Sequence, residues 1–162
     1  MKEHSSGFTY QEFDSPGSLS TTDHELIETA KRAAESSYAP YSKYHVGAAL
    51  RLVNGMVITG SNQENASFPV GSCAERVALF AAMASYPDIS IESIAITAHA
   101  EDFTVDSPVT PCGICRQAIL EYELRSGRKI RIIMAGETGP VYIVGSIGDL
   151  LPLSFSASEL KK

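Results

Sequence analysis

Three cysteines and one glutamate have the residue types and spacings that could perform metal chemistry. Cys112 and Cys115 form a Cys-x-x-Cys pair, and Cys73 lies two residues before Glu75. Thiolates at such spacings can chelate a single zinc ion. Three protein ligands leave the fourth zinc position open, which is the arrangement of a catalytic rather than a structural site. We therefore predict one catalytic Zn²⁺ per chain, held by Cys73, Cys112 and Cys115.

Two other interpretations of the cysteines are compatible with the bare pattern. A Cys-x-x-Cys pair can form a redox disulfide, but Pro111 precedes this pair and the third thiol stands 39 positions upstream. A closed structural zinc site would need a fourth ligand. None of the four histidines lies within a few residues of either cysteine motif. The odd number of cysteines also argues against a disulfide framework.

Glu75 and the arginines beside the two motifs could support the metal chemistry. On the first turn of a helix, Glu75 can project beside the metal and move a proton from zinc-bound water to a substrate nitrogen. The helix dipole alone would also favour an acidic residue there, but the open zinc position favours the catalytic role. We expect Arg76 to offset the thiolate charge from behind the ligands. For Arg116, the sequence does not decide between that role and a surface position.

The elements that must position these residues follow from hydrophobic periodicity and turn signals. Thr22 and Glu25 could form a capping box that starts a helix ending near Tyr38, and Asn54-Gly55 predicts a hairpin. The order of elements predicts an α/β domain in which helices cover a mixed sheet of about five strands. The expected elements are helices at 22–38, 74–84, 113–122 and 157–160, and strands at 46–53, 56–60, 91–98, 130–135 and 141–144.

Length and composition predict a single domain without a membrane span. The 162 residues, 44% of them hydrophobic, can bury a sufficient core. We expect residues 1–19 to be a loose, flexible N-terminal arm and residues 20–162 to form a single zinc-dependent domain. No apolar run reaches about 18 residues, and the start of the chain lacks the pattern of a signal peptide. These features predict a cytoplasmic protein that does not bind membranes.

The charge balance argues against a polynucleotide partner. The net charge is −6, with 13 basic against 19 acidic residues. Proteins that grip long nucleic acids neutralise phosphates with Lys and Arg, and no basic stripe is present here. We therefore expect a small-molecule substrate and no binding of nucleic acid.

Four separated motifs, taken in order, resemble those of the short-chain cytidine deaminases. The Cys-x-Glu and Pro-Cys-x-x-Cys segments match the zinc deaminase signature, in a variant with three cysteines. The residues around Leu150 and Phe155 resemble the C-terminal segment of that family, so the resemblance spans about residues 22 to 160. The four motifs are Tyr41–Ala49, Asn62–Phe68, Cys73–Arg76 and Pro111–Gln117.

The resemblance implies a fold, a reaction and a set of substrate contacts. The fold would be a three-layer α/β/α sandwich. The reaction would be hydrolytic deamination of cytidine and deoxycytidine to the uridine forms, with release of ammonia, in pyrimidine salvage. Asn62 and Glu64 would hydrogen-bond the sugar hydroxyl. The backbone of Ala74 and the side chain of Glu75 would read the pyrimidine edge, and Tyr44 would pack on the base.

The resemblance further implies a homotetramer in which neighbouring subunits complete each active site. Phe68 and Phe155 are the expected contacts across subunits. Three positions depart from the family pattern: Tyr44 replaces a usual Phe, Gln63 a usual Ile or Val, and Phe68 a usual Tyr. The preference between cytidine and deoxycytidine stays open.

Three alternative functions can be weighed against this one. A deaminase of an aminoacyl nucleoside of the blasticidin type would share the zinc motifs, but the Asn62-x-Glu64-Asn65 pattern favours a nucleoside. The acidic composition argues against an editor of RNA or DNA. A non-catalytic zinc module would leave Glu75 and the segment from Asn62 to Asn65 unexplained.

Overall fold

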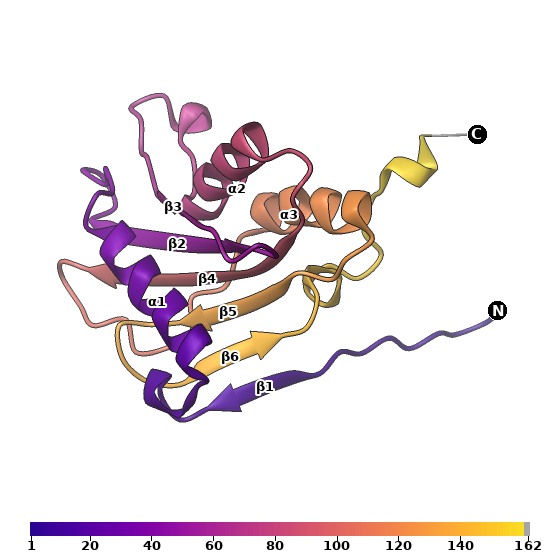
Figure 1. Cartoon of the computed structure of the whole chain (residues 1–162), viewed down its shortest axis with the longest axis horizontal. Coiled ribbons are helices and arrows are strands. Elements are labelled where there is room, and N and C mark those ends of the chain that lie inside the picture. Colours follow the sequence, from indigo (N-terminus) through magenta and orange to yellow (C-terminus); the bar gives the residue numbers. More distant parts are fainter. Residues whose placement is uncertain (161–162) are drawn as a thin grey trace.

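The centre of the molecule is a mixed six-stranded sheet, as seen in a computed structural model that describes residues 1–160 (Figure 1). The strand order is β1-β6-β5-β4-β2-β3. β4 and β5 pair in parallel, and the other neighbouring strands pair antiparallel. The strands are β1 (Tyr10–Phe13), β2 (Tyr44–Leu52), β3 (Val57–Ser61), β4 (Ile91–Ala100), β5 (Arg131–Ala135) and β6 (Val141–Val144).

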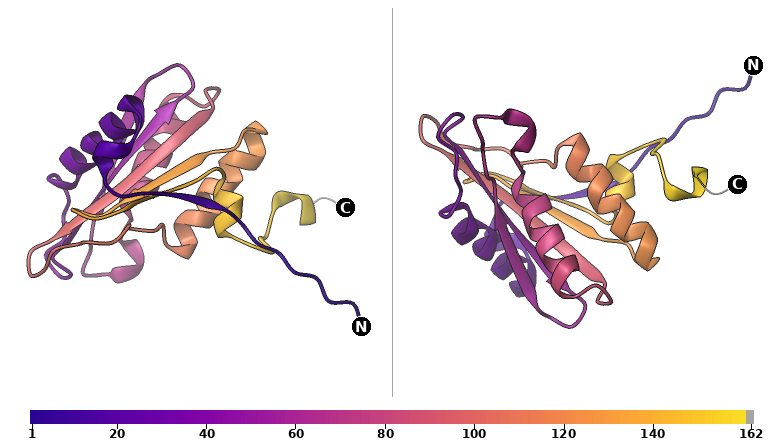
Figure 2. Two further views of the ribbon diagram at one scale, coloured as in Figure 1. Left: turned by 90° about the horizontal axis from the view of Figure 1, so that it is seen from below. Right: turned by 90° about the horizontal axis from the view of Figure 1, so that it is seen from above.

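Helices cover both faces of the sheet, which confirms the three-layer α/β/α sandwich (Figure 2). Helix α1 (Thr21–Ala34) lies on one face, and α2 (Ala74–Ser85) and α3 (Gly113–Ser126) lie on the other. Successive strand residues point to opposite faces, so Ala48 and Leu50 join the core under α2 and α3, whereas Ala49 joins the core under α1. Within residues 1–160, no helix is long and apolar enough to cross a membrane.

Two glycines let helices approach the sheet at backbone distance. A Cβ atom at Gly47 would lie 1.9 Å from the Ala30 carbonyl oxygen of α1. A Cβ atom at Gly60 would lie 2.4 Å from the amide nitrogen of Ala78 and 2.5 Å from the carbonyl oxygen of Ala74. Any side chain at Gly60 would therefore push the first turn of α2 away from β3. That turn follows directly on Cys73 and contains Glu75.

Helix α1 begins and ends earlier than the sequence patterns predict. Its N-cap is Ser20, whose hydroxyl accepts a hydrogen bond from the Asp23 amide at 3.2 Å, instead of the predicted box of Thr22 and Glu25. It ends at Ala34, where the Ser36 hydroxyl donates to the Ala33 carbonyl. Local side-chain hydrogen bonds of serine thus compete with continuation of the helix toward Pro40.

Part of the N-terminal arm belongs to the sheet. β1 pairs antiparallel with β6, and Phe13 and Leu19 pack against the core under α1. The residues before β1 extend away from the body of the molecule (Figure 1). At the other end of the chain, Ala157–Glu159 forms a short 3-10 turn where a helix over 157–160 was predicted.

Candidate active site

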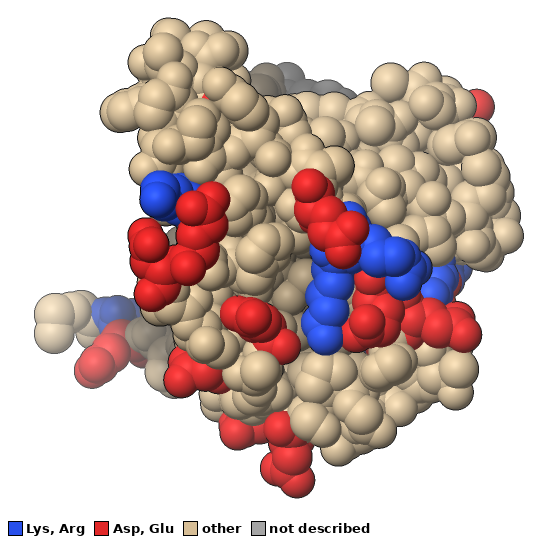
Figure 3. Space-filling view, turned by 90° about the vertical axis from the view of Figure 1, so that its left-hand side faces the viewer, with Lys and Arg blue, Asp and Glu red and all other residues tan. Residues whose placement is uncertain are grey.

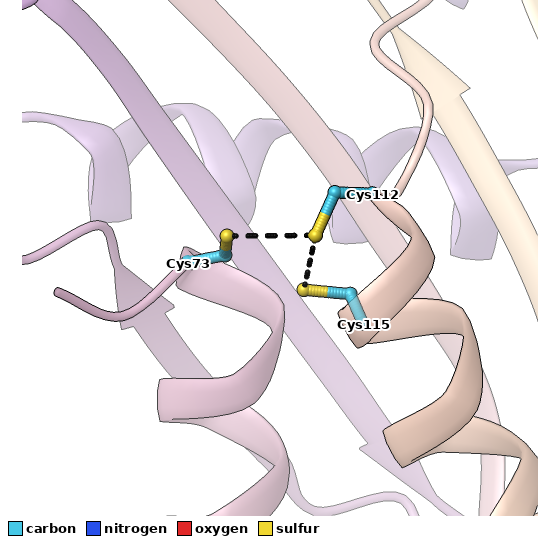
Figure 4. A group of neighbouring side chains, drawn as sticks. All are labelled: Cys73, Cys112 and Cys115. Carbon is cyan, nitrogen blue, oxygen red and sulfur yellow. Dashed lines mark hydrogen bonds between the residues drawn. The ribbon is translucent and has the colours of Figure 1, made fainter. Parts of the chain in front are cut away.

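The three thiols meet between the starts of α2 and α3 (Figure 4). Cys73 is the N-cap residue of α2, Cys112 is the N-cap residue of α3, and Cys115 lies in the first turn of α3. The Cys112 sulfur is 3.8 Å from that of Cys73 and 3.5 Å from that of Cys115. All three sulfur atoms lie within 4.8 Å of one another. Two segments 39 residues apart therefore contribute to one cluster.

The geometry and chemistry of this cluster fit a zinc ion. Tetrahedral coordination with Zn–S bonds of about 2.3 Å separates the sulfur atoms by about 3.8 Å. The observed separations of 3.8 and 3.5 Å are close to this value. Both helices also direct the partial positive charge of their N-termini at the sulfurs, which suits a cluster of thiolates. The cluster can thus hold one zinc ion through three thiol ligands.

Two thiols of the cluster differ strongly in their pKa values. The pKa of Cys73 is lowered to about 5, first because Cys115 hydrogen-bonds to its sulfur, and further by Cys112 and the Arg76 guanidinium. The same contact with Cys73, together with burial, raises the pKa of Cys115. Cys73 is therefore the thiolate of the pair. Since zinc binds thiolates, one ligand is already in the binding form at neutral pH.

Glu75 is buried beside the thiols at the start of α2. Its side chain is only 4% exposed, yet it lines the cavity that also contains Cys73 and Cys112. Burial raises the pKa of this carboxyl group, and the neighbouring Cys73 raises it further. A carboxyl group with a raised pKa at the base of a cavity is suited to accept and return protons.

The two arginines next to the motifs make different contacts. Arg76 donates to the Gly71 carbonyl at 3.2 Å, and its charge lowers the pKa of Cys73. Its buried Nε has no hydrogen-bond partner in residues 1–160. Arg116 instead donates to two backbone carbonyls, those of Pro111 and Leu150, both at 2.8 Å. Arg76 therefore lowers the pKa of the Cys73 thiol, first through a side-chain hydrogen bond and then through its charge, and also holds the Gly71 carbonyl. Arg116 instead holds the main chain on both sides of the site.

A cavity of about 750 Å³ opens above the thiols and Glu75. Most of the side chains predicted to bind substrate line it, and no Lys or Arg among the described residues does so. On the face of the molecule shown in Figure 3, basic side chains lie among acidic ones and form no continuous basic surface. The lining residues are Tyr41, Ser42, Tyr44, Val46, Asn62, Gln63, Glu64, Asn65, Phe68, Gly71, Ser72, Cys73, Glu75, Val109, Thr110 and Cys112.

Glu64 is held in place by the turn before β2. One carboxylate oxygen, Oε2, accepts hydrogen bonds from the amides of Tyr41 at 2.9 Å and Ser42 at 3.2 Å. The pKa of Glu64 is lowered, first by a hydrogen bond with the Ser42 hydroxyl and also by these two amides. The carboxylate is therefore ionised and oriented, and both amides bind Oε2 rather than Oε1.

Asn62 extends the pairing of β2 and β3 beyond the end of β3. Its Oδ1 accepts from the Val46 amide at 2.8 Å, and its Nδ2 donates to the Tyr44 carbonyl at 2.9 Å. Its own amide donates to the Val46 carbonyl at 3.1 Å. Asn62 thus fixes the backbone on both sides of His45 and, with it, the position of the Tyr44 ring.

The aromatic residues at the predicted site are only partly covered. The Tyr44 ring stacks on Phe103 with centroids 6.2 Å apart, and burial raises the pKa of Tyr44. Phe68 meets Tyr41 edge to face at 6.0 Å but is 76% exposed. Phe155 is 56% exposed and does not line the cavity of its own chain.

Other predicted and unpredicted residues complete the site. Ala74 is fully buried in the core, between two residues that line the cavity. Val109 and Thr110 also line the cavity, although neither was predicted to be a site residue. Their position immediately before Pro111 and Cys112 was the available signal, because residues next to a metal ligand must lie near the metal.

Comparison with known proteins agrees with this geometry. Residues 20–128 match the family described as the cytidine and deoxycytidylate deaminase zinc-binding region. The chain is 37% identical to a cytidine deaminase from Halalkalibacterium halodurans over 83% of this chain and 95% of that protein. It resembles the crystal structure of a cytidine deaminase from Burkholderia pseudomallei with a TM-score of 0.70 and 40% identity, over 82% of this chain and 98% of that one. A blasticidin-S deaminase from Bacillus cereus is 34% identical over 64% of this chain and 75% of that protein.

The fold, the three-thiol site and these similarities define the chain as a zinc-dependent hydrolase. It belongs to the cytidine and deoxycytidylate deaminase family.

Proposed function

We propose that the protein deaminates cytidine and deoxycytidine to uridine and deoxyuridine, with release of ammonia, and so serves pyrimidine salvage. The observation that carries this proposal is the buried Glu75 in one cavity with the zinc thiols and with Asn62 and Glu64. A zinc site and a proton carrier at the base of the cavity supply the chemistry. The side chains of Asn62 and Glu64 supply polar contacts for a sugar.

The side chain of Glu75 carries the protons of the reaction. Zinc, when bound, supplies Lewis-acid activation of the water that attacks C4 of the pyrimidine. The Glu75 carboxylate accepts a proton from that water and delivers it to N3, which makes C4 more electrophilic. Glu75 then takes the remaining proton of that water, now on the C4 hydroxyl, and transfers it to the amino group. The C4–N bond breaks, the C4 carbonyl forms and ammonia leaves, so that water and cytidine yield uridine and ammonia. Its burial keeps bulk water from competing for these protons.

The charges of the cavity favour a nucleoside over a nucleotide. Glu64 and Glu75 are the charged side chains that line it, and both are acidic. A 5′-phosphate would meet carboxylates without a compensating cation, and like charges at close range repel. The family description covers deaminases of both cytidine and deoxycytidylate. The acidic lining of this cavity favours the uncharged nucleoside over the nucleotide.

The proposed function can be tested with three substrates and one metal assay. We expect about one zinc per chain and a loss of the cytosine absorbance when cytidine or deoxycytidine is added. Deoxycytidine 5′-monophosphate should react with a lower kcat/KM by about tenfold or more, because its phosphate lacks a cationic partner. Full zinc content without any spectral change on cytidine would contradict the proposal. Equal rates on nucleoside and nucleotide would contradict only the argument from charge.

Glu64 provides the test against the blasticidin-type alternative. We expect Glu64→Gln to raise KM for cytidine by about tenfold or more, because a hydrogen bond from a sugar hydroxyl to a charged acceptor is lost. Steady-state kinetics measure the change. Glu35→Gln is the matched control, since Glu35 is exposed and lies outside the cavity. Unchanged kinetics of Glu64→Gln on cytidine would favour the alternative substrate.

The proposal includes a homotetramer whose active sites neighbouring subunits complete. Support comes from the exposure of Phe68 at the cavity and of Phe155 outside it, since both are large apolar side chains. A monomeric mass by light scattering would contradict the tetramer.

Arg76 is proposed to offset the charge of the thiolates. Three free cysteines are compatible with a reducing cytoplasm.

A further inference from the structure

Arg116 joins two segments that lie far apart in the sequence. Its Nε donates to the carbonyl of Pro111, and its Nη1 donates to the carbonyl of Leu150, each at 2.8 Å. Such bonds from a charged donor are about twice as strong as those between neutral groups. Pro111 directly precedes the zinc ligand Cys112, and Leu150 ends the 3-10 turn Ile147–Leu150. One side chain thus connects the metal-binding loop to the C-terminal part of the chain.

Arg116 also donates hydrogen bonds to both peptide units that flank Cys112. Its guanidinium fixes the carbonyl before Cys112, and its backbone amide donates to the carbonyl of Cys112 itself at 2.9 Å. Pro111 has no amide hydrogen, so this loop has fewer backbone donors to hold it. The Cys112 side chain caps no amide in the described α3 helix and is exposed. Beyond its contacts with the sulfurs of Cys73 and Cys115, the orientation of the Cys112 sulfur therefore depends on how the flanking peptide units are held.

Further side chains of α3 hold the segment that Arg116 contacts. Gln117 donates to the carbonyl of Phe155 at 3.0 Å. The buried Glu123 accepts from the Ile147 amide at 3.1 Å and from the Ser146 hydroxyl at 2.5 Å. Together these residues fasten the C-terminal segment, residues 146–155, along α3. Within this set, Arg116 also contacts the metal-binding loop, at the carbonyl of Pro111.

We propose that Arg116 is a positioning residue that sets the geometry of Cys112 for zinc and couples it to the C-terminal segment. Arg116 does this through hydrogen bonds to the backbone carbonyls of Pro111 and Leu150, whereas Arg76 acts on the Cys73 thiol itself. The proposal concerns retention of zinc in the absence of substrate. It therefore stands or fails independently of which nucleoside the enzyme converts.

The rate of zinc release to a coloured chelator tests the first half of the proposal. We expect Arg116→Ala to release zinc about ten- to a hundredfold faster than the natural sequence, since a charge-assisted bond beside a ligand is lost. Arg116→Lys keeps the charge and one bond, so an intermediate rate is expected, and this variant serves if the alanine variant does not fold.

Two control variants separate positioning from loss of stability. Arg125→Ala removes an arginine from the same helix, whose side chain donates a long hydrogen bond of 3.4 Å to the Pro87 carbonyl. Asp23→Asn weakens the ion pair with Arg131 on the other face of the sheet and lowers stability far from the zinc. The proposal is overturned if zinc leaves Arg116→Ala no faster than it leaves Asp23→Asn.

Hydrogen exchange tests the coupling, which must be reciprocal. In the natural sequence, removal of zinc should speed amide exchange in residues 147–155. In Arg116→Ala, exchange there should be fast whether or not zinc is bound. The coupling is overturned if removal of zinc leaves the exchange rate of these amides unchanged in the natural sequence. It is also overturned if removal of zinc changes the rate equally in both proteins.

Discussion

Glu75→Gln is expected to bind one zinc per chain and to deaminate cytidine at least about a hundredfold more slowly than the natural sequence. Glutamine has nearly the same shape as glutamate but cannot accept and return a proton at the substrate. The side chain is 4% exposed and burial already disfavours its charged form, so a neutral replacement should not weaken the fold. The loss should therefore appear in kcat.

Metal analysis, thermal unfolding and single-turnover kinetics together check this prediction. Glu121→Gln is a suitable control, because Glu121 is an exposed glutamate on α3 outside the cavity. It should show natural kinetics. A Glu75→Gln enzyme with full zinc and normal turnover would show that another group moves the protons.

The second large effect is expected from Cys112→Ala, which should leave a folded chain that has lost both zinc and activity. The sulfur of Cys112 lies between those of Cys73 and Cys115, so its removal leaves two ligands. The side chain is exposed, so alanine removes little buried surface. Cys115→Ala would be a poorer choice, because Cys115 is fully buried and its truncation would also leave a cavity in the core.

Dialysis against a chelator, followed by metal analysis and circular dichroism, measures this outcome. Ile114→Ala is the matched control, because Ile114 is 66% exposed and lies between the two cysteines of α3. It should retain zinc and activity. Stoichiometric zinc in Cys112→Ala after dialysis would mean that Cys112 is not a ligand.

The composition of the metal site was predictable because its chemistry restricts the residue types so strongly. Three thiols on two distant segments have few common purposes in a reducing compartment, and an open fourth position indicates a reaction. The starts of α2 and α3 were predicted directly after the two cysteine motifs, and the structure places them there, at Ala74 and Gly113. The sequence could not show that Arg76 and Arg116 make different contacts, since both simply follow a cysteine motif by position.

Other features could not be predicted because they depend on distant partners. β1 is short and mostly exposed, and its partner β6 lies more than 120 residues away along the chain. Nothing local in Tyr10–Phe13 indicates that pairing. The two bonds from the Asn62 side chain to β2 likewise require the hairpin to be formed first. Similarly, the choice of Ser20 as the cap of α1 was open among several Ser and Thr residues.

The division of the thiols between two helices gives the metal a role in chain topology. Zinc bound to Cys73 and Cys112 closes a loop of 39 residues, which contains all of α2 and β4. In the chain-entropy description of disulfides, a cross-link of this span restricts the unfolded chain by about 4 kcal/mol. In a reducing environment a disulfide cannot supply such a link. A zinc ion held by these thiols would therefore also serve as a cross-link that survives reducing conditions.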